Sequence, residues 1–200
     1  MLTLRSISLA AAAAVITIAP AFALPPVPRP APEFAVQLPD GSQTLLSSLK
    51  GKVVCLMFVH TTCPHCQHAT QVMSKLYGEY GSKGFQPVAV AFNTMAKMLV
   101  PDFVRNFQIN FPVGYAESDT VMSYLGLSMM ERSVVPQIVW IDKKGVIRSQ
   151  TPAMGDEKML GEPFWREQIE TLLKEPAGAS RVRHTTHPAS APAKAQSSLR

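Results

Sequence analysis

Cys63 and Cys66 are separated by only two residues, Pro64 and His65, so their two thiols are close enough to react with each other. Thiols at this spacing can close into a disulfide and reopen, so the pattern is typical of thiol–disulfide exchange. The third cysteine, Cys55, lies inside an apolar stretch and is predicted to be an inert buried thiol. Three cysteines are too few for a domain stapled by structural bridges, which indicates that the pair is catalytic.

The cysteine pair is predicted to sit where a buried strand passes into a helix. Pro64 suits the first helical position, which makes Cys63 the N-cap residue. The free N–H groups of the first turn and the helix dipole then favour a thiolate at Cys63, and His65 adds a further donor or a positive charge. Cys66 lies one turn later and deeper. We therefore expect Cys63 to be the nucleophile and Cys66 the resolving thiol.

The helix after the pair has the clearest periodicity in the chain. Its apolar residues recur at a spacing of three and four up to two closing glycines: Ala69, Val72, Met73, Leu76, Tyr77 and Tyr80. Other patterns predict strands at 34–38, 52–59, 85–92, 111–115, 133–141 and 146–149. Further helices are expected at 47–49 (one turn), from Pro101, at 119–125, and from Pro163. This alternation indicates an α/β fold with helices on both faces of the sheet.

The two ends of the chain differ in composition from the middle. Arg5, an apolar stretch from Ile7 to Ile18 and a small-x-small site ending at Ala23 predict a signal peptide over residues 1–23, cleaved after Ala23. An uncleaved N-terminal anchor is the alternative, and only then would the chain contact a membrane. We therefore expect the protein to be exported to the periplasm, a compartment in which disulfides persist.

The remaining boundaries follow from proline and charge. Residues 24–32 form a predicted extended Pro-rich linker, residues 33–174 the folded domain, and residues 175–200 a disordered basic tail. From Ala177 on, the tail holds four basic residues and no acidic one, which accounts for most of the net charge of +5. The domain itself is close to neutral, so we expect no nucleic-acid partner.

Residues Glu33 to Lys174 resemble the thioredoxin superfamily, and within it the exported TlpA- and ResA-like branch. The resemblance rests on the cysteine site and on four further runs: Pro39-Asp40-Gly41, Leu49-Lys50-Gly51-Lys52, Phe111-Pro112-Val113, and Pro136 followed by Ile141-Asp142-Lys143-Lys144-Gly145. It implies a thioredoxin-like three-layer α/β/α sandwich with a central mixed sheet. It also implies that Pro136 is a cis-proline facing the cysteines and that the backbone of Val135 pairs with a substrate chain.

The sequence departs from this family pattern at points that bear on the direction of electron flow. Thr62 stands where many relatives have Trp, and Met57 stands where many thioredoxins have a buried acid. The Cys-Pro-His-Cys sequence is that of the DsbA oxidants, whereas the surrounding scaffold resembles the reductase branch. The direction therefore stays open. We expect protein thiols or disulfides as substrates, a membrane or soluble redox partner, and no cofactor beyond the Cys63–Cys66 disulfide.

Two other functions compete with disulfide exchange. A copper or metal chaperone could use Cys63, Cys66, His60 and His68 as ligands, although His68 should point outward. A peroxiredoxin-like peroxidase would have Thr three residues and Pro seven residues before its reactive cysteine, positions that hold His60 and Leu56 here. The ten methionines fall mostly on interior positions of helices and strands, and we expect them in the core.

Overall fold

The computed structural model describes residues 24–177 of the 200-residue chain. The predicted signal peptide and nearly all of the predicted tail lie outside these residues. The helices and strands follow one another in this order: β1 (Arg29–Pro30), β2 (Ala35–Gln37), β3 (Gln43–Leu45), η1 (Leu46–Leu49), β4 (Val53–Val59), α1 (Pro64–Tyr80), η2 (Gly81–Lys83), β5 (Phe85–Ala91), α2 (Ala96–Asn106), β6 (Val113–Tyr115), α3 (Ser118–Leu125), β7 (Gln137–Ile141), β8 (Val146–Gln150) and α4 (Glu162–Lys174).

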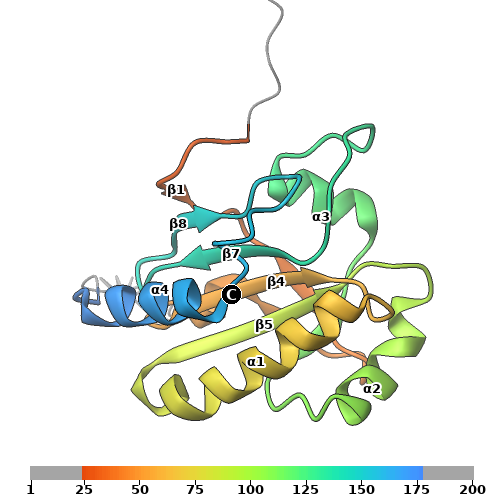
Figure 1. Cartoon of the computed structure of the whole chain (residues 1–200), viewed down its shortest axis with the longest axis horizontal. Coiled ribbons are helices and arrows are strands. Elements are labelled where there is room, and N and C mark those ends of the chain that lie inside the picture. The colour runs from red at the N-terminus through yellow and green to blue at the C-terminus, as the bar shows by residue number, and fades with distance from the viewer. Residues whose placement is uncertain (1–23, 178–200) are drawn as a thin grey trace, which may run out of the picture.

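The strands of the described residues join one mixed sheet in the order β1-β8-β7-β4-β5-β6-β2-β3. Figure 1 labels the part of this sheet from β1 to β5. Strands β4, β5 and β6 run parallel, and β7 runs antiparallel to β4. The apolar β4 therefore lies in the middle of the sheet, as its unbroken run of valine, leucine and phenylalanine predicted.

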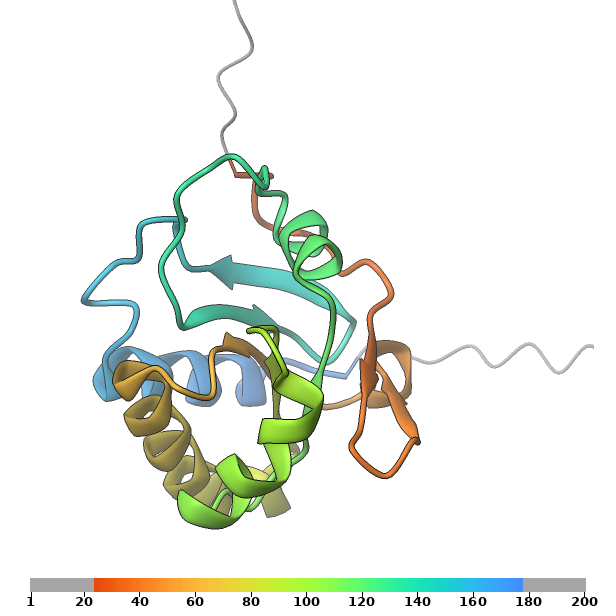
Figure 2. The same cartoon turned by 90° about the vertical axis from the view of Figure 1, so that its right-hand side faces the viewer.

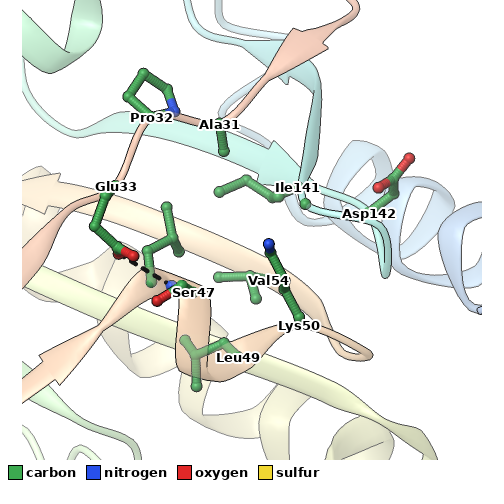
Figure 3. Close-up of a pocket in the computed structure, with 11 residues that line it drawn as sticks. Ala31, Pro32, Glu33, Ser47, Leu49, Lys50, Val54, Ile141 and Asp142 are labelled. Atoms are coloured by element: carbon green, nitrogen blue, oxygen red, sulfur yellow. Dashed lines mark hydrogen bonds between the residues drawn. The ribbon is translucent and has the colours of Figure 1, made fainter. Parts of the chain in front are cut away.

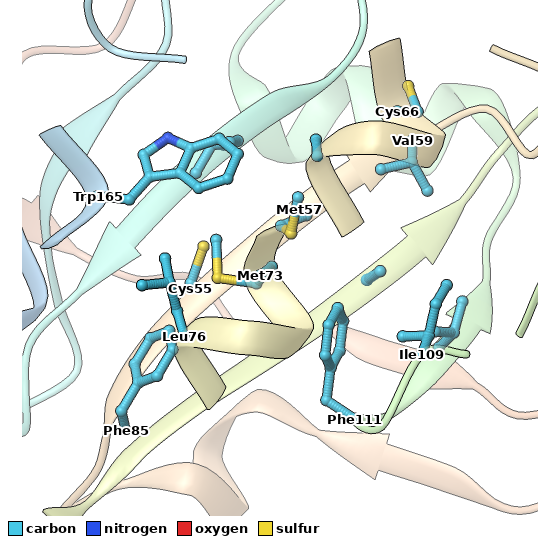
Figure 4. Packing of buried hydrophobic residues seen from close by; sticks show 14 of the residues in the cluster. Cys55, Met57, Val59, Cys66, Met73, Leu76, Phe85, Ile109, Phe111 and Trp165 are labelled. Carbon is cyan, nitrogen blue, oxygen red and sulfur yellow. The ribbon is translucent and has the colours of Figure 1, made fainter. Parts of the chain in front are cut away.

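The two faces of β4 are both covered by helices. One face carries Cys55 and Met57, and it packs against α1, α2 and α4 (Figure 4). The other face carries Leu56 and Phe58, which pack against α3. Because successive side chains of a strand point to opposite faces, a strand with both sets apolar must be the middle layer of a sandwich. The predicted three-layer α/β/α fold is confirmed.

The Pro-rich segment is not the extended spacer that we expected. Arg29 and Pro30 pair with Ile147 and Val146 at the edge of the sheet, and Arg29 donates to the Gln150 side chain. Strand β3 was also missed, because its three residues are mostly polar and follow a turn that could have led into a loop.

Helix α2 begins at Ala96, not at Pro101, which lies inside it. The apolar positions Ala96, Val100 and Phe103 are spaced as one helical face and are all buried. Packing of this face against the sheet therefore outweighs the tendency of proline to open or break a helix. Strand β7 starts at Gln137, later than predicted, because Pro136 ends a loop.

The methionines divide between the core and the surface. Met57 and Met73 are fully buried, as expected. Five others in the described residues are exposed, which corrects the expectation of a mostly interior set: Met95, Met98, Met129, Met130 and Met154. None of the helices within residues 24–177 is long and apolar enough to cross a membrane.

Candidate active site

Three strands bring the cysteine pair and the Pro136 loop to the same end of the sheet, where the central strands begin or finish. Strands β4 and β5 are parallel and both finish at this end, whereas β7 begins there, with Gln137 opposite Phe58. The loop that leaves β4 carries Cys63, and the loop that enters β7 carries Pro136. Figure 2 looks onto this end of the molecule.

Cys63 caps helix α1, as predicted from Pro64 at the first helical position. Its backbone is extended, with φ −87° and ψ 118°, and its carbonyl accepts the N–H of Gln67 at 3.0 Å. The side chain is half-buried, and its Sγ lies 3.9 Å from the carbonyl oxygen of Val135. The Cys63 sulfur therefore lies at the N-terminus of a 17-residue helix, where it can be reached from outside.

Cys66 lies beneath Cys63 and is fully buried among the apolar residues that α1 packs against the sheet (Figure 4). Burial raises the pKa of the Cys66 thiol well above its ordinary value. The two members of the pair thus differ: one sulfur can be reached from outside and the other stays protonated and covered. Cys55 is also a buried thiol, and burial raises its pKa too.

The loop before Cys63 is held by residues that the sequence did not single out. Asn93, just after β5, accepts the N–H of Thr61 at 2.9 Å and donates to the hydroxyl of Thr61 at 3.1 Å. Gln67, in the first turn of α1, donates to the carbonyl of Thr61 at 2.9 Å. These bonds fix the approach of the chain to the cysteine.

The loop that faces Cys63 is held by Gln137. The Val135–Pro136 bond is cis. The side-chain amide of Gln137, almost completely buried, donates to the carbonyls of Val134, Pro152 and Ala153 at 2.9, 3.1 and 3.1 Å. A polar residue at the head of the otherwise apolar run Gln137–Ile141 was the signal that could have pointed to this role.

Two hollows of similar size flank Cys63. One, of about 650 Å³, is lined by His65, His68, Val135 and Trp165, among others. The other, of about 660 Å³, is lined by His60, Thr62, Phe92 and further residues. His65 is exposed and reaches the first hollow only.

The four ligands considered for a metal are not gathered into a cluster. His60 and His68 line different hollows. His60 stacks edge-on against Phe92 at 4.5 Å between ring centroids, and burial lowers its pKa. Within residues 24–177, no group of three or more His, Cys, Asp or Glu side chains is arranged to hold a metal ion.

A further pocket, of about 230 Å³, lies at the opposite end of β4 (Figure 3). There the Glu33 carboxylate accepts the N–H groups of Ser47 and Phe34 at 3.0 and 3.1 Å. The hydrogen bonds from Ser47 lower the pKa of the Glu33 carboxyl. No cysteine or histidine lines this pocket. The Glu33 bond to Ser47 ties the segment before β2 to η1, away from the cysteine pair.

Comparison with known proteins places this geometry among disulfide-exchange proteins. The thiol-disulfide oxidoreductase ResA of Bacillus thuringiensis (strain Al Hakam) is 29% identical over 147 residues, which cover 74% of this chain and 76% of the relative. A putative protein disulfide isomerase from Bacteroides thetaiotaomicron superposes with a TM-score of 0.62 at 25% identity, over 75% of this chain and 91% of that chain. A putative thiol:disulfide interchange protein DsbE from Chlorobium tepidum gives 0.60 at 25% identity, over 73% and 96%.

These likenesses confirm the predicted relation to thiol–disulfide oxidoreductases of thioredoxin fold. The family model described as AhpC/TSA family matches residues 27–150. That match covers the cysteine pair, the Pro136 loop and every strand of the sheet. The chain belongs to the AhpC/TSA family.

Proposed function

We propose that this protein is a thiol–disulfide oxidoreductase that exchanges disulfides with protein or peptide clients through Cys63 and Cys66. The single observation that carries the proposal is the asymmetry of the pair. The Cys63 sulfur is reachable at a helix N-terminus, opposite the carbonyl of Val135, and the Cys66 thiol is buried directly behind it.

The exchange balances without any further reactant. The Cys63 thiolate attacks one sulfur of a client disulfide; that S–S bond breaks, a mixed disulfide forms, and the second client sulfur leaves as a thiolate. Cys66 then gives up its proton and attacks the Cys63 sulfur. The mixed disulfide breaks, the client leaves reduced, and the Cys63–Cys66 disulfide remains. The same steps in reverse oxidise a client dithiol.

Val135 offers the client a place to pair. Within the described residues, its N–H and carbonyl take part in no backbone–backbone hydrogen bond. The amide of Gln137 donates to the carbonyl of the preceding Val134, and the Val135 carbonyl lies 3.9 Å from the Cys63 Sγ. An extended client segment can therefore add itself to the backbone of Val135 and bring its sulfur to Cys63. His65, next to the nucleophile, is proposed to tune the reduction potential.

We also propose that the protein is exported and works in the periplasm, with a membrane or soluble partner that resets the pair. The predicted signal peptide and the exported character expected of ResA- and DsbE-like proteins support this placement. Mass spectrometry of the mature protein tests it: a chain that begins at Leu24 is expected. A chain that retains residues 1–23 would favour the N-terminal anchor.

Turnover of a peptide disulfide by three single variants tests the function. Cys63→Ala should abolish exchange, Cys66→Ala should stop it at a mixed disulfide, and the matched control Cys55→Ala should keep full activity. Retained turnover in Cys63→Ala would overturn the proposal. Consumption of hydrogen peroxide by the reduced protein at a comparable rate would favour the peroxidase alternative.

The direction of transfer is decided by the reduction potential of the pair, measured by equilibration with glutathione. A value near roughly −120 mV identifies a donor of disulfides, and a value near roughly −270 mV or lower identifies a reductant.

A further inference from the structure

The turn that leads into Cys63 has one buried and one exposed central residue. The Cys63 N–H donates to the His60 carbonyl at 3.2 Å, which closes a β-turn with Thr61 and Thr62 at its centre. Thr62 is exposed, whereas Thr61 is only 6% exposed. The placement of Cys63 at the start of helix α1 therefore depends on the contacts that hold Thr61.

Two side chains from different elements bind the polar groups of Thr61. The Asn93 amide oxygen accepts the Thr61 N–H at 2.9 Å, and the Asn93 amide nitrogen donates to the Thr61 hydroxyl at 3.1 Å. Gln67, in the first turn of α1, donates to the Thr61 carbonyl at 2.9 Å. Because Thr61 is buried, these groups need partners inside the protein, and Asn93 supplies two of the three bonds.

The backbone of Asn93 belongs to the corner between β5 and α2. Its carbonyl accepts the N–H of Ala96, in the first turn of α2, at 3.0 Å, and its side-chain amide donates to the Thr94 carbonyl at 3.1 Å. Met95 follows with a left-handed backbone, φ 61° and ψ 20°. A residue with a Cβ keeps this conformation only where the surrounding structure holds it. The Asn93 side chain is therefore carried by a firmly held corner.

We propose that Asn93 is a positioning residue for disulfide exchange, which acts through Thr61 to hold the turn that presents the Cys63 sulfur. The inference rests on the proposed function, in which Cys63 is the nucleophile. Asn93 itself contacts no reacting atom. A nucleophile displaced by about 1 Å can react roughly a hundredfold more slowly, so the hold on this turn bears directly on the rate.

The expected effect of Asn93 differs from that of Gln137. Gln137 bonds to the loop opposite Cys63, with which a client chain is proposed to pair. Asn93 acts on the side of the nucleophile, so its loss should slow the attack on any disulfide, large or small. The bond from Gln67 to Thr61 and the closing bond of the turn remain in an Asn93 variant. We therefore expect a loosened turn and a partial loss of rate.

Formation of a mixed disulfide in a Cys66→Ala background measures the Cys63 step alone. Asn93→Leu keeps nearly the same volume and removes both amide groups. It should slow this step about tenfold with a peptide disulfide, and by the same factor with glutathione disulfide. Stopped-flow measurements well below the melting temperature give both rates.

Gln86→Leu in the same background is the matched control. Gln86 is a buried amide at the opposite end of β5, and its nitrogen donates to the Pro87 carbonyl at 3.0 Å. Its replacement removes a buried hydrogen bond from the same strand without touching the turn at Cys63. The control should lose stability in urea titrations and keep both exchange rates.

A pair of variants at Thr61 tests the same contact with Asn93 intact, and it decides the question if Asn93→Leu does not fold. Thr61→Ser keeps the hydroxyl and should react within about twofold of the Cys66→Ala parent. Thr61→Val has nearly the same shape as threonine but leaves the Asn93 amide nitrogen without this partner. It should slow mixed-disulfide formation about threefold with both disulfides.

Four outcomes would overturn the positioning role of Asn93: unchanged rates in Asn93→Leu, equal slowing in Gln86→Leu, slowing with the peptide disulfide alone, or equal rates in Thr61→Ser and Thr61→Val. Slowing with the peptide alone would assign the effect to client pairing and not to the nucleophile. Failure of the Cys66→Ala parent to form any mixed disulfide on Cys63 would instead refute the proposed function.

Discussion

Replacing Gln137 by leucine tests how the loop opposite Cys63 is positioned. The substitution keeps nearly the same volume and removes the amide that donates to the carbonyls of Val134, Pro152 and Ala153. The loop that carries Val135 then loses its side-chain tie to the loop after β8 and keeps the bond from the Val134 N–H to the Ala153 carbonyl at 2.9 Å.

The size of the effect on stability follows from these contacts. The amide group has two hydrogens for three carbonyls, so about two full hydrogen bonds are lost, each worth roughly 0.5–1.5 kcal/mol net. The free energy of unfolding should fall by about 1–3 kcal/mol. At roughly 2–4 °C per kcal/mol for a domain of this size, the melting temperature should drop by several degrees.

The effect on function should depend on the client. In the proposed function a peptide disulfide pairs with the backbone of Val135, which predicts that its exchange slows by about tenfold in this variant, equivalent to roughly 1.4 kcal/mol. Glutathione disulfide, too short to pair along the loop, should exchange within about twofold of the wild-type rate. Stopped-flow measurements well below the melting temperature give both rates.

Gln150→Leu is the matched control for this prediction. Gln150 is also buried, lies on the neighbouring strand, and donates to the Leu125 carbonyl at 2.8 Å, away from Val135. It should lower stability and leave both exchange rates unchanged. Equal loss of peptide exchange in the two variants, or unchanged peptide exchange in Gln137→Leu, would refute a positioning role for Gln137.

Three further changes have defined outcomes. Asp142→Ala should lower the free energy of unfolding, measured by urea titration, by roughly 2–4 kcal/mol. The reason is that the buried Asp142 carboxylate accepts two backbone N–H groups of the β7–β8 turn and one arginine N–H. Peptide exchange should be unchanged in this variant. Burial raises the pKa of the Cys66 thiol and the Tyr124 phenol above their ordinary values of 9.0 and 10.0. The unfolded chain releases these protons first, so stability should fall as the pH rises past about 9, with a shallower fall in Tyr124→Phe. Gly126→Ala should lower the melting temperature, because φ is 71° there and a Cβ would strike the ring of Pro25. No fall with pH, an unchanged Gly126→Ala, or a loss of exchange in Asp142→Ala would each contradict the corresponding reasoning.

Strands and helices could be predicted from the sequence where burial of one or both faces gives their apolar residues a regular spacing. Strand β4 and helix α1 have apolar residues at the spacing of their own geometry, and their bounds came out within a residue or two. Helix α2 did not, because Pro101 is a local signal that tertiary packing overrides. Strand β1 could not be predicted from the sequence, because Arg29 and Pro30 form a strand only by pairing with β8.

The positions of the two cysteines could be predicted from the sequence, whereas the residues that hold the loops around them could not. Spacing alone indicated that Cys63 caps the helix and that Cys66 lies deeper, and both positions are as expected. The roles of Asn93 and Gln137 depend on loops that meet only in the folded chain. The exposed methionines were missed because hydrophobicity predicts burial and carries no signal for an apolar side chain kept at the surface.

Trapping of the client adduct tests the central claim most directly. Cys66→Ala, reduced and mixed with a peptide disulfide, should accumulate a mixed disulfide, and peptide mapping by mass spectrometry should place it on Cys63. Cys63→Ala under the same conditions should give no adduct. An adduct on Cys55, or none on Cys63 in the Cys66→Ala variant, would contradict the assignment of Cys63 as the nucleophile.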